Sequence, residues 1–296
     1  MSFLQITSVV ANVQITPLGS QTGEFCQFDR AFILQDPDGT RLLYDAGRTV
    51  AGAGDPRLGK IDVILVSHMH GDHVGDKHIA AVGEGDCKDT QTPVDALPNT
   101  NSVNIALAKG ATIITGSEMP KFFASKLKAL GGDPQQSQLV RFGASHKVGD
   151  VAITTVPAVH SNGISGQMIG GELGDMLDVA GLTAYAGPPT GYVLIFSNGL
   201  SVYLSGDTGI TAEQKTVVRD YYRVQLAIVN IGDTFTTGPT QAAWVVNELI
   251  QPKSVIASHA NQPSTEKGKI IAGIGKINAL FSSERKCHNC DSRQFR

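Results

Sequence analysis

The chain of 296 residues lacks the features of membrane and exported proteins. It contains no run of about 18 apolar residues, so we predict no membrane-spanning helix and no membrane partner. Its amino terminus has neither a basic start nor a long apolar stretch, which argues against a signal peptide. These absences favour a cytoplasmic protein.

An excess of positive charge is also missing. The 24 Lys and Arg residues are outnumbered by 27 Asp and Glu residues, and no basic cluster stands out. Proteins that bind nucleic acids usually display a basic patch, so we predict no nucleic-acid partner and expect a small-molecule substrate. The sequence does not fix the oligomeric state, and a homo-oligomer stays open.

Cysteine is scarce, with 4 residues in the chain. We expect Cys26 and Cys87 to be isolated rather than parts of a disulfide framework. Cys287 and Cys290 have C-x-x-C spacing, which could bind a metal or undergo redox cycling. Because residues 282–296 are polar and show neither helical nor strand periodicity, we predict that both lie in an exposed, poorly ordered C-terminal tail.

Histidine is concentrated in one place, although the chain contains only 8. His68, His70, Asp72 and His73 directly follow an apolar, β-branched run at 61–66 that predicts a buried strand. In an extended backbone His68 and His70 point the same way, and the intervening glycine lets the loop turn before the other two. Imidazole and carboxylate ligands suit zinc and similar divalent ions. This segment could therefore supply ligands to two neighbouring metals.

A single histidine is more often an ordinary polar residue than a metal ligand, but four metal-capable side chains so close together favour a site. The pattern His68-x-His70-x-Asp72-His73 resembles the signature of the metallo-β-lactamase superfamily of metal-dependent hydrolases. The resemblance implies an α/β fold, a four-layer αβ/βα sandwich with one or two metal ions at the edges of its sheets. It also implies three more ligands downstream.

The chain provides candidates for all three downstream ligands. His160, Asp207 and His259 each follow an apolar segment that predicts a strand, and loops after strands commonly build sites. Taken alone, Asp207 could cap a helix and His160 could belong to a turn. Asp45 resembles a position that supports the ligand loop, although an aspartate in an ordinary turn fits equally well. The resemblance assigns one metal to His68, His70 and His160, a second metal to Asp72, His73 and His259, and the bridging position to Asp207.

The resemblance implies an enzyme, a hydrolase with two divalent metal ions. The ligands favour zinc, while manganese, iron and cobalt stay open. Two cations that share a water acidify it, so a bridging hydroxide is the expected nucleophile, with Asp72 and Asp207 as the catalytic carboxylates. A lactone or another carboxylic ester or amide is the expected substrate, and a phosphodiester is the alternative. A non-catalytic metal-binding protein and a di-iron oxidoreductase form a different class, but redox members of the fold carry Glu where this chain has His70.

The segment 231–239, which reads Ile-Gly-Asp-Thr-Phe-Thr-Thr-Gly-Pro, carries a narrower resemblance. Together with Ala242, Ala243 and His259, it is similar to the branch that contains the ascorbate-6-phosphate lactonase-like hydrolases. Residues 261–263, Asn-Gln-Pro, follow His259 where many members of that branch carry a Tyr nearby. This departure weakens any transfer of the substrate from that branch.

Turn and periodicity signals predict one domain over residues 1–281, built from two strand-and-helix halves that face each other. The long loop 161–191 leaves directly from His160, and its apolar residues could form a lid over the substrate. A surface insertion or an oligomer contact is the alternative for this loop. We expect an edge strand at 3–15, hairpin turns at 36–39 and 197–199, and helices at 103–109, 117–130, 211–220, 241–250 and 267–281.

Overall fold

The computed structural model describes residues 12–20, 26–84, 92–94, 100–263, 265–266, 269–271, 276 and 280. Several expectations fall outside these residues and stay predictions. They concern most of the strand at 3–15, Cys87, most of the helix at 267–281, and the tail 282–296 with Cys287 and Cys290. The predicted domain limits, residues 1 and 281, likewise stay a prediction.

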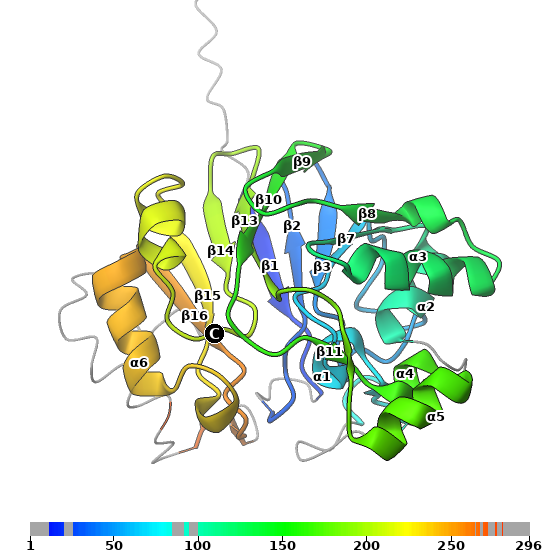
Figure 1. Ribbon diagram of the computed structural model, residues 1–296. Helices are drawn as coiled ribbons and strands as arrows, with labels where there is room; N and C mark the ends of the chain where they lie inside the picture. The colour runs from blue at the N-terminus through cyan, green and yellow to red at the C-terminus, as the bar shows by residue number, and fades with distance from the viewer. Residues whose placement is uncertain are drawn as a thin grey trace, which may run out of the picture.

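Two six-stranded sheets face each other in the described part of the chain. The first has the order β1 (Gln14–Pro17), β2 (Phe32–Gln35), β3 (Arg41–Tyr44), β4 (Val63–Leu65), β7 (Thr112–Thr115), β8 (Ser137–Leu139). The second has the order β16 (Ser254–Ser258), β15 (Leu226–Asn230), β14 (Ser201–Leu204), β13 (Thr190–Ile195), β10 (Val151–Pro157), β9 (Ser145–Val148). Figure 1 shows the strands gathered in the middle of the molecule.

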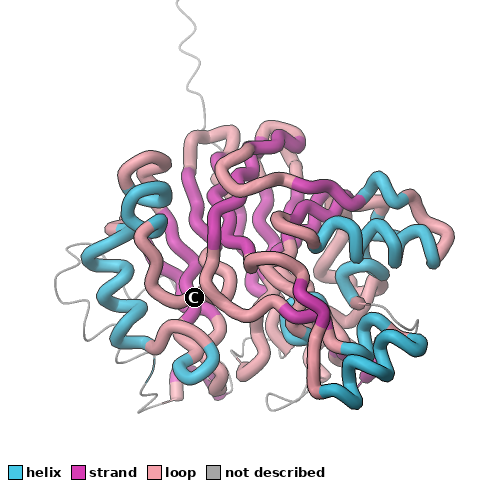
Figure 2. Tube along the Cα trace, viewed as in Figure 1, coloured by secondary structure: helices cyan, strands magenta, loops and turns pink. Residues whose placement is uncertain are grey.

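Helices cover the outer faces of both sheets, which confirms the predicted four-layer αβ/βα sandwich (Figures 1 and 2). The first sheet is flanked by α2 (Asn101–Lys109) and α3 (Met119–Ala129). The second is flanked by α6 (Pro239–Trp244), its π-helical continuation Val245–Ile250, and another π-helical segment, Gln214–Arg219. Smaller helical elements are α1 (Gly71–Val74) and the 3-10 turns Pro134–Gln136 and Asp233–Phe235. Two short strand pairs are β5 (Lys77–His78) with β6 (Thr92–Pro93), and β17 (Thr265–Glu266) with β18 (Lys269–Ile270).

Strand β4 shows why the segment before the histidine cluster folds as predicted. Val63, Ile64 and Leu65 are fully buried, and successive side chains of a strand point to opposite faces. Val63 and Leu65 pack in the core between the sheets, whereas Ile64 packs in the core that includes residues of α2 and α3. A strand that is covered on both faces has a continuous apolar sequence, which explains residues 61–66.

The predicted ligands follow strands that end at one edge of the sandwich. Strands β10, β14 and β16 run in the same direction within the second sheet. Two contacts attach the ligand loop of the first sheet to this edge. The Thr190 N–H donates to the Ser67 carbonyl oxygen over 2.8 Å, and the Tyr192 hydroxyl donates to the Val66 carbonyl oxygen over 2.7 Å. Loops from both sheets therefore meet here.

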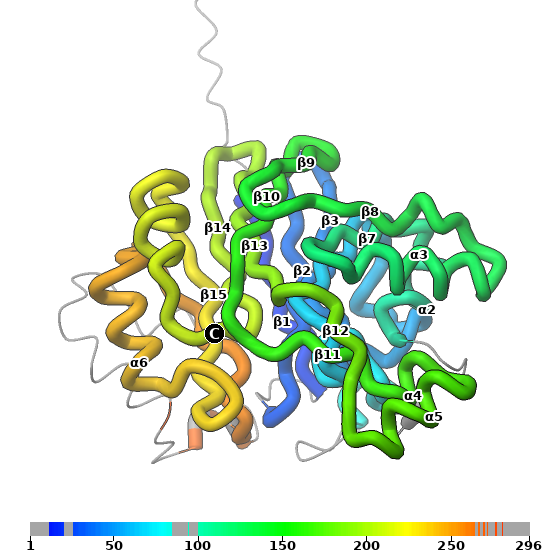
Figure 3. Tube along the Cα trace, viewed as in Figure 1, coloured from blue at the N-terminus to red at the C-terminus, as the bar shows by residue number. Residues whose placement is uncertain are grey.

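The segment 161–191 is a structured insertion that contains β11 (Gly163–Ile164), α4 (Gly166–Ile169), α5 (Gly171–Ala180) and β12 (Ala184–Tyr185). Figure 3 shows α4 and α5 below α2 and on the opposite side from α6.

The apolar side chains of this insertion point in different directions. Helix α5 packs closely on α4, because a Cβ on Gly174 would lie 2.4 Å from the Gly166 carbonyl oxygen. Met168 is buried in the core, whereas Leu173 and Met176 are 61% and 63% exposed to solvent. The expectation that these residues form one apolar wall over the substrate is therefore wrong.

Two local expectations are also wrong. Cys26 is disulfide-bonded rather than isolated, because separation along the sequence does not limit which cysteines meet in space. The helix expected at 117–130 begins at Met119 instead, because Ser117 has a φ of 58° and donates its hydroxyl to the Pro188 carbonyl oxygen. Among the described residues, no helix has the length and apolar character needed to cross a bilayer.

Candidate metal centre

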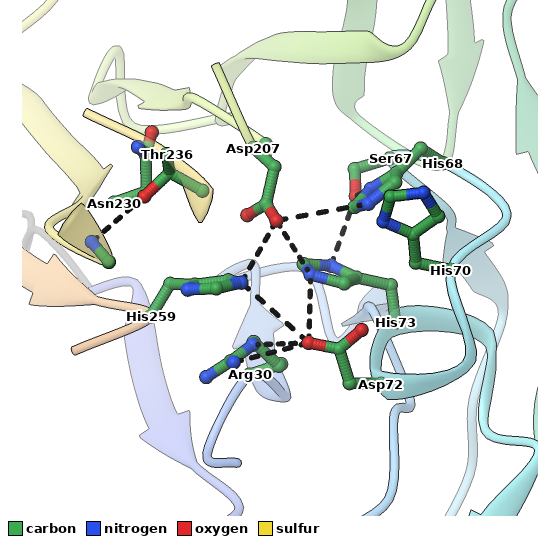
Figure 4. Close-up of polar contacts among 12 residues, drawn as sticks. Arg30, Ser67, His68, His70, Asp72, His73, Asp207, Asn230, Thr236 and His259 are labelled. Atoms are coloured by element: carbon green, nitrogen blue, oxygen red, sulfur yellow. Dashed lines mark hydrogen bonds and ion pairs between the residues drawn. The ribbon is translucent and has the colours of Figure 1, made fainter. Parts of the chain in front are cut away.

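All seven predicted ligand side chains meet at the edge where the strands end. We call His68, His70 and His160 the histidine triad, and we call Asp72, His73 and His259 the mixed triad. Within each triad the potential ligand atoms lie within 4.8 Å of one another. Asp207 lies between the triads, and Figure 4 shows its carboxylate pointing toward histidines of both.

The Asp207 carboxylate occupies the centre of the cluster. Its Oδ2 atom lies 2.9 Å from His259 Nε2, 3.3 Å from His73 Nε2, and 3.8 Å from the Nε2 atoms of both His68 and His160. The residue is 3% exposed, so this oxygen is held away from bulk water. One oxygen thus faces histidines of both triads, which is the geometry that a bridging carboxylate requires.

Asp45 orients two of the histidines, His73 by direct contact and His68 through Ser67. Its Oδ1 accepts the Ser67 backbone N–H over 2.8 Å, and its Oδ2 accepts the Ser67 hydroxyl over 2.7 Å. The same Oδ2 lies 2.8 Å from His73 Nδ1, while the Ser67 hydroxyl oxygen lies 3.0 Å from His68 Nδ1. With the proton of both imidazoles on Nδ1, both Nε2 lone pairs face Asp207, as ligation of a metal requires. Asp45 therefore contacts the ligand loop, as the resemblance implies.

Two buried nitrogen atoms test whether this cluster suits a metal. The Nε2 atoms of His68 and His73 have no hydrogen-bond partner among the described residues, although both are shielded from solvent. Leaving a buried polar atom unpaired costs about 1–3 kcal/mol. Imidazole nitrogens and carboxylate oxygens are ligands of borderline divalent metals, so cations among the triads would satisfy these atoms. The residues present therefore fit a pair of divalent ions.

The charges in the cluster are arranged for cation binding. Burial lowers the pKa of His68 well below its ordinary value of 6.5, and it also lowers the pKa of His70 and His160. The three imidazoles are thus neutral at neutral pH, which is the form that binds metals. Burial opposes ionisation of Asp207, but His73 and His259 outweigh it and hold the pKa of this carboxyl well below 3.8. An anionic carboxylate therefore sits among mostly neutral histidines.

His73 differs from the other histidines. Burial alone would lower its pKa, but Asp207, Asp72 and Asp45 outweigh burial and raise the pKa well above 6.5. The three carboxylates therefore attract a positive charge to this position, and in the metal-free protein the proton on His73 supplies that charge. By contrast, burial and the nearby Arg30 lower the pKa of His259.

Arg30 is the principal residue that sequence reasoning missed. Its side chain is 2% exposed, and its Nη2 and Nε donate to Asp72 Oδ2 over 3.1 and 3.3 Å. Nη2 also donates to Asn261 Oδ1 over 2.7 Å, which connects the ligand loop to the loop that follows His259. No sequence signal could have identified Arg30, because it lies 42 positions from Asp72 and 231 positions from Asn261.

A groove opens beside the histidine triad. It has a volume of about 530 Å³ and is lined by residues that include His160, Val159, Ile210 and Phe235. The segment 233–238, from the motif that suggested the lactonase-like branch, forms one wall. The side chain of His160 is 15% exposed, so the histidine triad is the part of the cluster that borders this groove.

Comparison with known proteins agrees with the motif and the fold. The family model described as a β-lactamase superfamily domain matches residues 40–260. A metal-dependent hydrolase of Koribacter versatilis is 31% identical over 231 residues, which cover 77% of this chain and 79% of that protein. A metal-dependent hydrolase of Methanopyrus kandleri is 31% identical over 228 residues, or 75% of this chain and 77% of that protein. The structure of a metallo hydrolase from Ignicoccus hospitalis has a similar fold, with a TM-score of 0.57, 20% identity, and coverage of 92% of this chain and 91% of that one.

Proposed function

The chain belongs to the β-lactamase superfamily and is a metal-dependent hydrolase, and on that premise we propose that it uses two divalent ions, most consistent with zinc, to cleave an ester-like bond. The histidine triad would hold one ion, the mixed triad the other, and Asp207 would bridge them. When bound, such a pair of ions acidifies a shared water and polarises the bond under attack.

One observation carries this proposal. A single oxygen of Asp207 lies 2.9–3.8 Å from the Nε2 atoms of four histidines that come from three separate loops. A structural role for the cluster would not explain why two of these buried nitrogen atoms lack a hydrogen bond among the described residues. Asp45 contacts His73 and Arg30 contacts Asp72, and these contacts fix the orientation of the two proposed ligands.

The groove favours a carboxylic ester, lactone or amide over a phosphodiester. No Lys or Arg lies among the residues that line it, and Asp233 is the one Asp or Glu among them. A phosphodiester carries a negative charge that usually meets Arg, Lys or a phosphate-binding loop. Arg30 does not take this role, because its buried guanidinium is already bonded to Asp72 and Asn261.

The test pairs metal analysis with a substrate panel of carboxylic esters, lactones, amides and phosphodiesters. We expect two metal ions per chain in the native protein and at most one in the His68→Ala variant, which should have lost ester hydrolysis. His146→Ala is the matched control, because His146 lies in β9, outside both triads. Metal-loaded protein that cleaves only phosphodiesters would replace the ester proposal with the phosphodiesterase alternative. Native protein without bound metal would contradict the proposal altogether.

A further inference from the structure

Three large apolar side chains project from the groove beside His160. Val159, Ile210 and Phe235 are 62%, 48% and 67% exposed, and all three line the same cavity. Single exposed apolar residues are common on protein surfaces, but their convergence on one cavity is typical of a ligand site. They come from the loops after β10, β14 and β15, so the fold assembles this cluster from distant parts of the chain.

Hydrogen bonds tie the three loops together. The Thr208 hydroxyl oxygen accepts the Val159 N–H over 3.0 Å, and the Gly209 N–H donates to the Val159 carbonyl oxygen over 3.0 Å. The Thr237 N–H and hydroxyl both donate to the Thr208 carbonyl oxygen, and the hydroxyl contact is 2.5 Å. These groups bond to one another, so the three loops are held together, and Val159, Ile210 and Phe235 are the apolar part of a lining that also contains Thr234, Thr236 and Gln241.

Charge further restricts what the groove accepts. Asp233 is its only acidic residue, and the side chain of Asp233 is 59% exposed with Lys276 Nζ at 3.9 Å. With no Lys or Arg in the lining, an anionic group bound in the groove away from the metal centre would lack a cationic partner and would face this carboxylate. An uncharged alkyl or aryl chain would instead cover three exposed apolar side chains.

We propose that this groove binds an uncharged apolar chain carried by the substrate, and that Val159, Ile210 and Phe235 determine that specificity. The inference rests on the proposed function, because it places the chain next to the histidine triad where the ester-like bond would be cleaved. The cavity of about 530 Å³ is large enough for a chain of several carbon atoms. The substrate class is therefore a hydrophobic ester, lactone or amide.

Chain-length kinetics test this specificity. Metal-loaded full-length protein is assayed with p-nitrophenyl esters from acetate to octanoate and with n-alkyl acetates from methyl to hexyl. We expect kcat/KM to rise by up to about fourfold per CH₂ in at least one series. Phe235→Ala should flatten that slope, and Phe235→Leu should restore part of it. Tyr221→Ala is the matched control, because Tyr221 is 75% exposed and lies outside the groove lining. Flat series, or slopes that survive Phe235→Ala, would overturn the assignment.

A binding measurement separates this inference from the proposed function. Methyl NMR of isoleucine-labelled protein follows the Ile210 signal, which Ile210→Val identifies, during titration with hexanamide, acetamide and inorganic phosphate. We expect a saturable shift with hexanamide, a much weaker response to acetamide, and none with phosphate. If this shift occurs while no ester is hydrolysed, the groove assignment stands and the ester proposal fails. If esters are hydrolysed without any hexanamide-dependent shift, the groove assignment fails and the ester proposal stands.

Discussion

The histidine triad and the mixed triad flank the same carboxylate, yet they differ in charge and in what borders them. The histidine triad has three neutral imidazoles and borders the groove through His160. The mixed triad contains a carboxylate, and the buried Arg30 holds that carboxylate from the far side. Under the proposed function, the histidine triad would face the substrate, and the mixed triad would be fixed by the protein interior.

This division follows from which loops supply each triad. His160 and its neighbour Val159 line the groove, whereas His259 is 5% exposed and its loop is connected through Asn261 to Arg30. An open position on the side of the histidine triad is also what a catalytic metal needs. Four predictions sharpen or break the comparison, ordered by expected effect.

Removal of the shared carboxylate should have the largest effect. Asp207→Ala deletes the one side chain that faces both triads, so we expect kcat/KM to fall by at least about 10³-fold. Metal analysis of the same variant should give fewer than two ions per chain. Asp220→Ala, which alters a half-exposed aspartate outside the cluster, is the control and should retain both properties. Normal turnover in Asp207→Ala would break the view that the triads act as a pair.

Loss of Arg30 should affect only the mixed triad. Arg30→Met removes the two hydrogen bonds to Asp72 Oδ2, so we expect the affinity for one of two metal ions to fall about 10–100-fold. Chelator competition followed by metal analysis measures the two affinities separately. Arg30→Lys should recover part of the loss, because a lysine keeps the charge but not the paired donors. Equal weakening of both ions would show that Arg30 does not distinguish the triads.

A stability comparison addresses the difference in burial. His259→Ala should lower the free energy of unfolding of the metal-free protein by about 2 kcal/mol, because it removes a buried side chain that contacts Asp207 over 2.9 Å. His160→Ala should lower it by less than about 1 kcal/mol, because the imidazole is partly exposed and lies 3.8 Å from Asp207. Urea unfolding measures both values. A larger loss of stability in His160→Ala than in His259→Ala would contradict the idea that the protein interior fixes the mixed triad more firmly than the histidine triad.

The last expected effect is the pH dependence of the metal-free protein, in which no single group exceeds the change of about 2 kcal/mol expected for His259→Ala. His68 and His259 have lowered pKa values. Their contribution to the free energy of unfolding is therefore complete above pH 6.5 and is lost as the pH falls below that value. His73 has a raised pKa, so its contribution to the free energy of unfolding is complete below pH 6.5 and is lost as the pH rises above that value. Each group changes stability by up to about 1.4 kcal/mol per pH unit.

We therefore expect the free energy of unfolding to be greatest near pH 6.5 and to decrease toward both pH 5.5 and pH 7.5. Urea unfolding at the three values measures this curve. His73→Gln should remove the decrease on the alkaline side while leaving the acidic side in place. A wild-type curve that rises steadily through pH 7.5 would contradict the assigned role of His73.

The strands could be predicted from local signals, and the resemblance carried by the histidine motif implied the architecture and the three downstream candidate ligands. Apolar runs mark the strands, and the candidate ligands follow where strands end, as β4 and His68 illustrate. Arg30 and Asn162 were beyond prediction because their roles are set by tertiary contacts. Asn162, for example, accepts the Met69 N–H over 2.8 Å from 93 positions away. The insertion at 161–191 was misjudged because apolar spacing does not reveal which face of a short helix is buried.

The most direct test is the position of bound metal. Crystals of zinc-loaded protein, measured for anomalous scattering at the zinc edge, should give two peaks, one next to each triad, with Asp207 between them. A single peak away from Asp207, or none at full zinc loading, would contradict the account of a paired metal centre.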